Sequence, residues 1–363
     1  MKIRELNISG SHFDMGYQHG QEYKEDIIRM TAERVALSSD QYWTGQELSK
    51  KAVFELAEAC IVEHEKYNPD LLEELKGMAS ATDLSLAELI IAGGFTDFID
   101  IVYNSQNLKS DTKANHAADN CTAFLVPKTK TKTQNGYFGQ TWDMHDTASE
   151  FVVLLKGKPK NKPSFIIFTT VGCLGMIGLN SEGIAIGINN LSSTNGKIGV
   201  TWPFIVRDVL EQSSLPSALN SITRANLAGA HNYLIMDSHS NGYNIEAMPD
   251  KAIITKLETQ AVIHTNHCLI SETKELERER TEESIVSSTN RYNKASEILA
   301  KDSISLKDLQ ELTREPSAIC TISKPPSHVE TCGAAIIEPA RGKFWALWGL
   351  PSKNEFEEFD IPK

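Results

Sequence analysis

The sequence lacks several features that would assign it to a particular class of protein. No two of its cysteines form a CxxC pair, which excludes a zinc ribbon and a thioredoxin-type redox motif. No uninterrupted apolar run reaches the roughly 18 residues of a membrane-spanning helix. The opening MKIRELNISGSHF has no apolar segment of the signal-peptide kind. We therefore expect a cytoplasmic protein that does not enter a membrane.

The sequence also has fewer basic residues than acidic ones. The chain has 36 Lys and Arg residues against 48 Asp and Glu residues, which gives a net charge of −12. This balance argues against a nucleic acid or an anionic membrane surface as the partner, but it does not restrict small substrates. A hydrophobic content of 40% is ordinary for a globular protein with a full core. A length of 363 residues fits one large domain or two average ones.

Six cysteines are present, and nothing in the sequence points to an oxidising compartment. In a long chain without a secretion signal, free thiols are expected rather than a disulfide framework. Most of them are expected to be buried structural thiols. They are Cys60, Cys121, Cys173, Cys268, Cys320 and Cys332.

The first third of the chain, residues 19–103, has a mainly helical pattern. In 49-SKKAVFELAEACIVEHEKY-67 apolar residues recur at spacings of three and four, as a helix with one buried face requires. The run 70–93 predicts two helices divided at 82-TDLS-85, where Ser85 or Asp83 would cap the second. Residues 104–120 are almost wholly polar, which predicts an exposed loop.

From Cys121 onward the pattern is that of strands with helical interludes. Helices are predicted at about 203–227, 282–300 and 306–314, and Ser305 is expected to cap the last. A group of helices, a run of strands, more helices and a final hairpin predict a layered α/β arrangement. Strands are predicted in 121–127, 137–143, 151–157, 164–170, 173–179, 183–191, 232–248 (with a type I′ turn at Asn241-Gly242), 252–257, 261–267 and 333–351.

Cys121 lies where the polar loop meets the first of these strands, in 116-HAADNCTAFLVPKTK-130. A tight turn at 135–136 would pair Asp143 with Lys128. A wide loop over 127–136 would instead pair Cys121 with Trp142 and bring Asp143 beside the cysteine. Pro127 cannot donate to a strand ladder, and the lysines that follow it suit an exposed loop. The second register is therefore favoured.

A thiol beside a carboxylate is a poor nucleophile, because negative charge raises the pKa of the thiol. The pairing makes chemical sense if Cys121 also carries a free α-amino group, which the carboxylate of Asp143 could anchor and which could take the proton of the thiol. An internal cysteine acquires such an amine only if the Asn120–Cys121 bond is cut. A junction between loop and strand is a place where a cut can be tolerated.

Five segments, in order along the chain, resemble a known family. They are 10-GSHFDMGYQHG-20, 121-CTAFLVP-127 with 139-GQTWD-143, 178-GLNSEGIAIGINNL-191, 264-HTNH-267 and 288-STNRY-292. Together they are similar to the acyl-coenzyme A:6-aminopenicillanic acid acyltransferase family (peptidase family C45). These are N-terminal-nucleophile hydrolases related to penicillin V acylase and the bile salt hydrolases. The resemblance covers most of the chain.

The resemblance implies a four-layer αββα sandwich of antiparallel sheets and a precursor that cleaves itself between Asn120 and Cys121. Residues 1–120 would form a mainly helical α chain and residues 121–363 the catalytic β chain, the two making one domain. Cys121 would be the nucleophile and its own α-amino group the base, with Asp143 holding that amine. The resemblance implies no cofactor and no metal.

The remaining site residues are also implied by the resemblance. The side-chain amide of Asn266 and a backbone N–H near Asn189 or Asn190 would bind the oxyanion, and Trp142 would contact the substrate. Arg291 would supply the charge that orients the site. Two positions depart from relatives: Asn120 stands where the fungal acyltransferases have Gly, and Gln140 stands where the bile-acid branch has Arg.

Each of these residues also has a purely structural interpretation. Asp143 could end a strand, Asn266 could sit in a turn, and Arg291 could pair on a helix surface with Glu282 or Glu283. His264 and His267 would point to opposite faces of a strand, and no third ligand accompanies them, so a metal site is not expected. An apolar acyl pocket could be lined by Trp142, Trp202, Phe204 and Tyr233.

The expected function is cleavage of a small N-acyl amine or N-acyl amino acid through a thioester on Cys121. The expected partner is thus a small acyl amide or acyl thioester, and a homo-oligomer is possible. Transfer of the acyl group from acyl-CoA to an amine is the alternative, with Lys128, Lys130 and Lys132 the only basic cluster suited to CoA. A third interpretation is an unprocessed binding protein that kept the fold and lost the chemistry.

Overall fold

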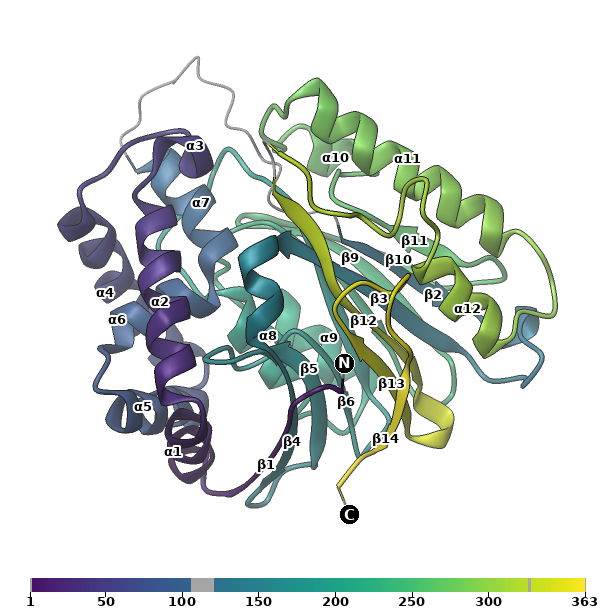
Figure 1. Cartoon of the computed structure of the whole chain (residues 1–363), viewed down its shortest axis with the longest axis horizontal. Helices are drawn as coiled ribbons and strands as arrows, with labels where there is room; N and C mark the ends of the chain where they lie inside the picture. The colour runs from purple at the N-terminus through teal and green to yellow at the C-terminus, as the bar shows by residue number, and fades with distance from the viewer. Residues whose placement is uncertain (1, 106–120, 326–327, 363) are drawn as a thin grey trace.

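The computed structural model describes residues 2–105, 121–325 and 328–362. Residues 106–120, which make up most of the predicted polar loop and include Asn120, lie outside the described residues. Figure 1 shows two β-sheets in the middle of the molecule, a group of N-terminal helices at one side and further helices on the outer surfaces of the sheets.

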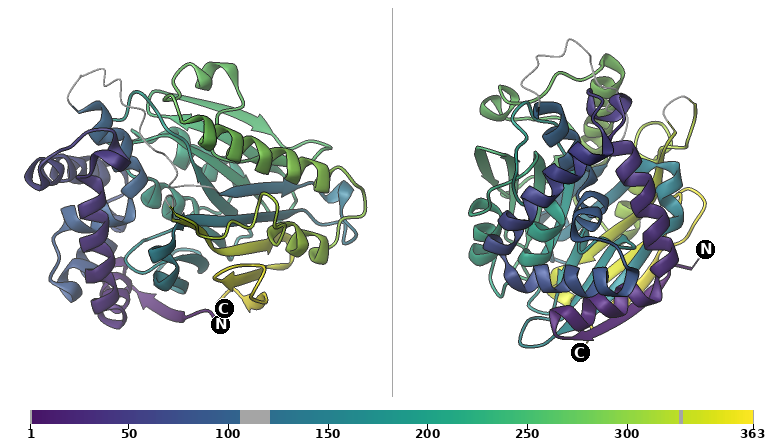
Figure 2. Two further views of the ribbon diagram at one scale, coloured as in Figure 1. Left: turned by 45° about the horizontal axis from the view of Figure 1, so that its top comes forward. Right: turned by 90° about the vertical axis from the view of Figure 1, so that its left-hand side faces the viewer.

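The N-terminal helices follow the expected pattern. Ser49 caps the helix predicted over 49–67, and Ser85 forms a capping box with Glu88 at the start of the second helix predicted in 70–93. Asp83 instead ends the preceding helix in a left-handed conformation. The group, seen face-on in the right-hand view of Figure 2, comprises α1 (His12–Glu22), α2 (Lys24–Ser38), α3 (Gln41–Thr44), α4 (Lys50–Tyr67), α5 (Pro69–Thr82), α6 (Leu86–Gly93) and α7 (Phe95–Asn104).

Helices α1 and α5 cross at glycines. A Cβ atom at Gly16 would lie 1.7 Å from the carbonyl oxygen of Glu74, and one at Gly77 would lie 2.0 Å from the carbonyl oxygen of Phe13. Because no side chain fits at either position, the two backbones touch directly. This contact gives a physical reason for the glycine spacing in the segment 10–20.

The first sheet, sheet A, has eight strands in the order β1-β4-β5-β6-β7-β8-β9-β10. Every neighbouring pair is antiparallel except β1 and β4, which run parallel. Asn180 and the left-handed Gly183 close the predicted hairpin between β6 and β7. The strands are β1 (Glu5–Gly10), β4 (Val152–Pro159), β5 (Phe165–Thr170), β6 (Ile177–Asn180), β7 (Ala185–Asn190), β8 (His231–Met236), β9 (Gly242–Met248) and β10 (Lys251–Lys256).

The second sheet, sheet B, is antiparallel throughout and has the order β11-β2-β3-β12-β13-β14. The final hairpin predicted over 333–351 is present as β12 and β13, and β14 extends it. The strands are β2 (Thr122–Val126), β3 (Tyr137–His145), β11 (Val262–His264), β12 (Val329–Glu338), β13 (Lys343–Trp348) and β14 (Glu357–Asp360).

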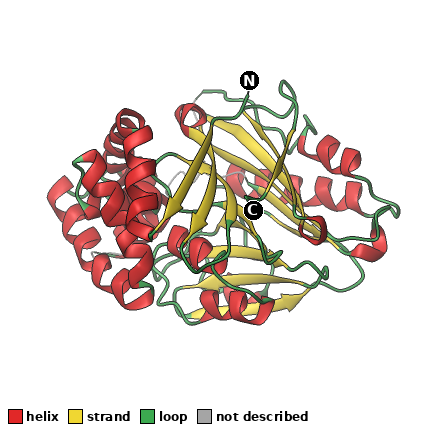
Figure 3. Cartoon of the chain, turned by 90° about the horizontal axis from the view of Figure 1, so that it is seen from below, coloured by secondary structure: helices red, strands yellow, loops and turns green. Residues whose placement is uncertain are grey.

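The two sheets pack face to face, with β2 and β3 against β7 and β8. Helices α8 (Trp202–Val209) and α9 (Leu215–Thr223) cover the outer surface of sheet A, and α11 (Glu282–Leu299) and α12 (Leu306–Thr313) cover that of sheet B (Figure 3). The predicted αββα layering is confirmed. The short helices α10 (Ser271–Lys274), η1 (Lys128–Lys130), η2 (Asp146–Phe151) and η3 (Pro339–Arg341) complete the fold.

Two local predictions were wrong. The strand expected over 173–179 begins only at Ile177, because the left-handed Gly172 and a tight turn precede it. The turn between β8 and β9 is centred before Asn241-Gly242. The carboxylate of Asp237 accepts from the backbone N–H groups of His239 and Asn241 there, and Ser240 takes the left-handed conformation. Among the described helices, none is long and apolar enough to cross a bilayer.

Candidate active site

The hairpin of β2 and β3 has the register that the sequence favoured. Val126 lies opposite Tyr137 and Thr122 opposite Thr141, so the same register places Cys121 opposite Trp142. Residues opposite each other in a ladder share a face, and the next pair lies on the other face. The two-stranded ribbon formed by β2 and β3 therefore has two faces. Its inner face carries Cys121 and Trp142 in the core between the sheets, and its outer face is directed at α11.

Cys121 stands at the start of β2 and is 2% exposed. Its Sγ lies 3.9 Å from the main-chain oxygen of Asp143. Because Asp143 follows Trp142 along β3, its carboxylate lies on the outer face, whereas the thiol lies on the inner face. The thiol thus meets a neutral carbonyl group rather than the charge that would weaken it as a nucleophile.

Arg291 reaches from α11 to the start of β2. It is 1% exposed, so the predicted alternative of a surface pair with Glu282 or Glu283 is wrong. One end of its guanidinium donates to the carbonyl oxygen of Cys121 and, at 3.4 Å, to Oγ1 of Thr122. The other end donates to Oδ1 of Asn266 at 3.0 Å.

Asn266 extends this network of hydrogen bonds to sheet A. Its Nδ2 donates to the main-chain oxygen of Asn190 at 3.0 Å, and its backbone N–H donates to Oγ of Ser288 at 2.9 Å. Asn266 lies in a bend just after β11, as its structural interpretation expected, and it is also fully buried. Cys121, Arg291, Asn266 and Asn190, which come from four separate parts of the chain, form one continuous network.

Asp143 is fully buried, and burial raises the pKa of its carboxyl to about 7. The nearby guanidinium of Arg291 and the surrounding threonine hydroxyls work in the opposite direction and lower that pKa. Neither carboxyl oxygen has a partner with hydrogen-bond geometry within the described part of the chain. A buried carboxyl in this state calls for a donor or a cation.

The other predicted contacts are close to the network. Asn189, one residue before Asn190, donates from Nδ2 to Oδ1 of Asn232 at 3.0 Å. An oxyanion role for a backbone N–H near Asn189 or Asn190 stays a prediction. One N–H of the Asn266 amide is already committed to the Asn190 carbonyl.

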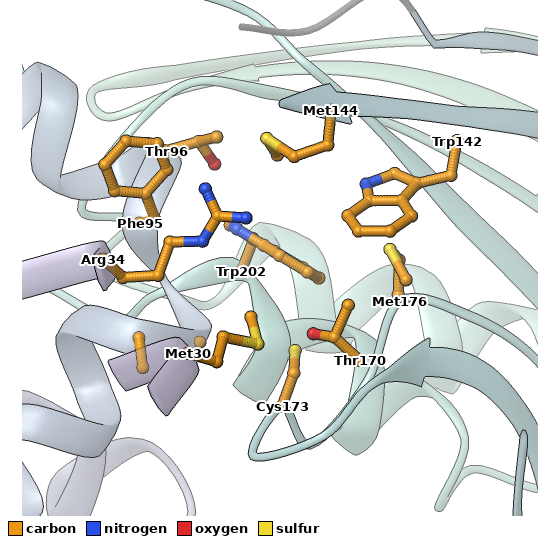
Figure 4. A pocket seen from close by; sticks show the side chains of 12 residues that line it. Met30, Arg34, Phe95, Thr96, Trp142, Met144, Thr170, Cys173, Met176 and Trp202 are labelled. Atoms are coloured by element: carbon orange, nitrogen blue, oxygen red, sulfur yellow. The ribbon is translucent and has the colours of Figure 1, made fainter. Parts of the chain in front are cut away.

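A small cavity opens beside Trp142 on the inner face of the ribbon (Figure 4). Its volume is about 30 Å³, enough for roughly two water molecules. Of the four aromatic residues expected to form an acyl pocket, Trp142 and Trp202 line it. The lining is rich in sulfur and aromatic side chains and includes Met30, Arg34, Phe95, Thr96, Trp142, Met144, Thr170, Cys173, Met176 and Trp202.

Arg34 is the lining residue that sequence reasoning missed. It comes from α2, whose buried face consists of Ile27, Met30, Thr31, Arg34, Val35 and Ser38. A charged residue that recurs at the spacing of a buried helix face is an unusual combination. That combination was the signal available in the sequence.

Other predicted polar groups lie away from this site. Lys130 is buried and donates to the carbonyl oxygen of Ala300 at 2.9 Å, beyond the far end of β2 from Cys121. Nε2 of His264 lies 2.9 Å from Oε1 of Glu246, and Nδ1 of His267 lies 2.7 Å from Oγ of Ser288. All six cysteines are described and buried, and no disulfide joins any two of them.

Comparison with known proteins identifies relatives. A curated acyl-coenzyme A:6-aminopenicillanic-acid-acyltransferase 40 kDa form from Emericella nidulans is 24% identical over 269 residues, 73% of this chain and 70% of the relative. Among solved structures, a variant of conjugated bile acid hydrolase from Clostridium perfringens matches with a TM-score of 0.46 and 12% identity, covering 67% of this chain and 98% of that one. Penicillin V acylase from Agrobacterium tumefaciens matches with a TM-score of 0.41 and 12% identity, covering 66% and 86%.

The model of one protein family, described as acyl-coenzyme A:6-aminopenicillanic acid acyl-transferase, matches residues 129–353. This range begins after Cys121 and includes Asp143, Asn266 and Arg291. Because the match spans more than half of the sequence and confirms the resemblance seen in its motifs, the chain belongs to the acyl-coenzyme A:6-aminopenicillanic acid acyltransferase family.

Proposed function

We propose that this protein is a self-processing cysteine amidohydrolase that acts on small N-acyl amines or N-acyl amino acids. Cleavage of the Asn120–Cys121 bond would leave an α chain of residues 1–120 and a β chain of residues 121–363, associated through the shared core. Asn120 itself lies outside the described residues. Cys121 would thereby become a chain terminus with a free α-amino group.

The observation that carries this proposal is the buried carboxyl of Asp143 at the end of the ribbon where Cys121 begins. While Cys121 is joined to Asn120 its nitrogen is an amide, and the pKa of Asp143 is raised to about 7 by burial. An α-ammonium group at the same place would supply a cation and favour the ionised carboxylate. The site is thus better suited to the cleaved chain than to the intact one.

The reaction would proceed in two stages. The α-amino group takes the thiol proton of Cys121, Sγ attacks the acyl carbonyl carbon, and the carbon–nitrogen bond breaks as the leaving amine receives a proton from the α-ammonium. Water then gives a proton to the α-amino group and attacks the thioester. The carbon–sulfur bond breaks, the sulfur takes that proton to restore the thiol, and a carboxylic acid leaves. Each stage passes through an oxyanion, for which Asn266 and a backbone N–H near Asn189 or Asn190 are the proposed donors. One preorganised donor lowers the barrier by about 2.7–4 kcal/mol.

Acyl transfer is the second candidate, and the family name favours it. The same thioester would be resolved by an amine instead of water, with acyl-CoA as a possible donor. The basic cluster at Lys128, Lys130 and Lys132 does not support this alternative, because it follows the far end of β2 and Lys130 is buried.

The test is to incubate the protein with hexanoyl-amino acids and to follow free amine and hexanoic acid, with Cys121→Ala as the control. Hydrolysis predicts both products from the wild-type protein and neither from the variant. Repeating the assay with hexanoyl-CoA and an added amine separates transfer from hydrolysis, because a new amide that replaces hexanoic acid would identify an acyltransferase. No product in either assay would favour the third interpretation, a binding protein without chemistry.

A further inference from the structure

The bend that carries Asn266 has little backbone structure to hold it. The strand before it, β11, is three residues long and lies at the edge of sheet B, beside β2. The ladder of β11 ends at His264, and residues 265–267 follow with neither helix nor strand. Segments of this kind are more mobile than the elements that they connect. The position of Asn266 must therefore be fixed largely by side chains.

Three consecutive residues of this bend bind a single residue of α11, Ser288. The backbone N–H of Asn266 donates to Oγ of Ser288 at 2.9 Å. The hydroxyl of Thr265 donates to the main-chain oxygen of Ser288 at 3.1 Å, and Nδ1 of His267 lies 2.7 Å from Oγ of Ser288. Ser288 is 1% exposed, and Thr265 and Asn266 are fully buried. Bulk water therefore does not compete for these contacts.

The same helix also holds the side chain of Asn266. Ser288 and Arg291 are three positions apart, a spacing that places two residues on one face of a helix. Arg291 donates to Oδ1 of Asn266 at 3.0 Å, whereas Ser288 accepts from its backbone. A primary amide has two N–H groups, and one of them donates to the main-chain oxygen of Asn190. The direction of the other N–H thus depends on both contacts with α11.

We propose that Ser288 is a positioning residue, which fixes the bend so that the remaining N–H of the Asn266 amide points at the oxyanion. This inference rests on the proposed amidase function and on the oxyanion role proposed there for Asn266. A donor stabilises a transition state most when it is already in place before the charge develops. Ser288 acts through Asn266 rather than by contact with the substrate.

The test compares kcat and KM for N-hexanoylglycine between matched serine variants. Ser288→Ala should lower kcat by roughly 10- to 100-fold, because a misplaced donor loses much of its effect. KM should stay within about twofold of its wild-type value, since the donor acts on the transition state. Ser288→Thr keeps the hydroxyl and should restore most of kcat. Rates are expressed per processed chain, measured by intact mass, so that slower self-cleavage does not imitate a lower kcat.

Ser296→Ala is the control, because Ser296 is a half-buried serine of the same helix whose hydroxyl donates to the main-chain oxygen of Tyr292 at 2.8 Å. It should leave kcat and KM unchanged. If Ser288→Ala does not fold, Thr265→Val removes the hydroxyl that donates to the Ser288 main chain and should lower kcat by a smaller factor. A wild-type kcat in either folded variant, a change in KM alone, or an equal loss in Ser296→Ala would overturn the proposal.

A spectroscopic measurement separates this inference from the proposed function. In the unprocessed Cys121→Ala variant labelled with ¹⁵N-asparagine, the side-chain amide signals of Asn266 are assigned by their loss in Asn266→Ala. Adding Ser288→Ala should move or broaden these signals, and adding Ser296→Ala should leave them unchanged. This result without turnover in the wild-type protein would refute the hydrolase but support the orientation of Asn266 by Ser288. Signals that Ser288→Ala leaves unchanged would refute the positioning role.

Discussion

The two faces of the ribbon formed by β2 and β3 place adjacent residues in different surroundings. On the inner face Cys121 and Trp142 meet a cavity lined by sulfur and aromatic groups. On the outer face Thr122 meets the guanidinium of Arg291, and Asp143 is buried near that charge. Strand alternation thus keeps the thiol away from the carboxylate although the two residues come from neighbouring strands.

This separation answers an objection that the sequence alone raises. A carboxylate in contact with a thiol would raise the pKa of the thiol and weaken the nucleophile. Here Sγ of Cys121 lies 3.9 Å from the main-chain oxygen of Asp143. The backbone nitrogen of Cys121 belongs to the ribbon itself, so an amine formed there would be accessible from both faces.

The largest effect should come from the outer face, on replacing Arg291. Arg291→Ala leaves the Cys121 carbonyl and Oδ1 of Asn266 without this donor. Each buried group left unsatisfied costs about 1–3 kcal/mol, so we expect a loss of roughly 2–6 kcal/mol in the free energy of unfolding, measured with urea. Processing and activity should fall with it.

Arg29→Ala is the matched control, because Arg29 is an exposed arginine that also pairs with two carboxylates. Exposed pairs contribute about 0.2–1 kcal/mol. Arg291→Lys keeps the charge without the planar fork and should rescue only part of the loss. If the two alanine variants were equally stable, the outer-face network would not hold the site together.

A smaller, pH-dependent effect should come from Asp143→Asn, measured in the unprocessed Cys121→Ala background. Burial raises the pKa of Asp143 from 3.8 to about 7, so its contribution to stability is full below about pH 4 and is lost as the pH rises toward 7. The free energy of unfolding of the asparagine variant should therefore rise relative to that of its parent between pH 4 and pH 8, by up to roughly 4 kcal/mol.

Asp250→Asn provides a control of opposite sign. The hydrogen bond from Lys197 lowers the pKa of Asp250, so that aspartate contributes stability above about pH 4 and loses it as the pH falls. The free energy of unfolding of the Asp250→Asn variant should therefore fall relative to that of its parent as the pH rises. A free-energy difference for Asp143→Asn that stays constant with pH would contradict the raised pKa of this buried carboxyl.

Local signals in the sequence were enough for much of the fold. Ser85 and Ser305 cap their helices as predicted, and each also forms a capping box with the acidic residue three positions later. The register of β2 and β3 follows from Pro127, which ends β2, and it places Cys121 opposite Trp142. The roles of Cys121, Asp143, Asn266 and Arg291 remain predictions, although the structure brings their side chains or backbones into one region.

What the sequence could not give depends on distant pairing. β1 joins sheet A by lying parallel to β4, about 150 positions along the chain, and only Ile8 among its residues is fully buried. The place of Arg34 is another case, since its distance from Trp202 depends on how α2 packs against the sandwich rather than on either local sequence.

The central claim is that Cys121 becomes a chain terminus, and an intact mass under denaturing conditions tests it most directly. The wild-type protein should give two fragments divided at Asn120–Cys121, whose masses sum to that of the whole chain plus one water. Cys121→Ala should stay whole, whereas Cys332→Ala, which removes another buried thiol, should still divide. A wild-type chain that stays whole after long incubation would remove the free amine from the mechanism and contradict the account.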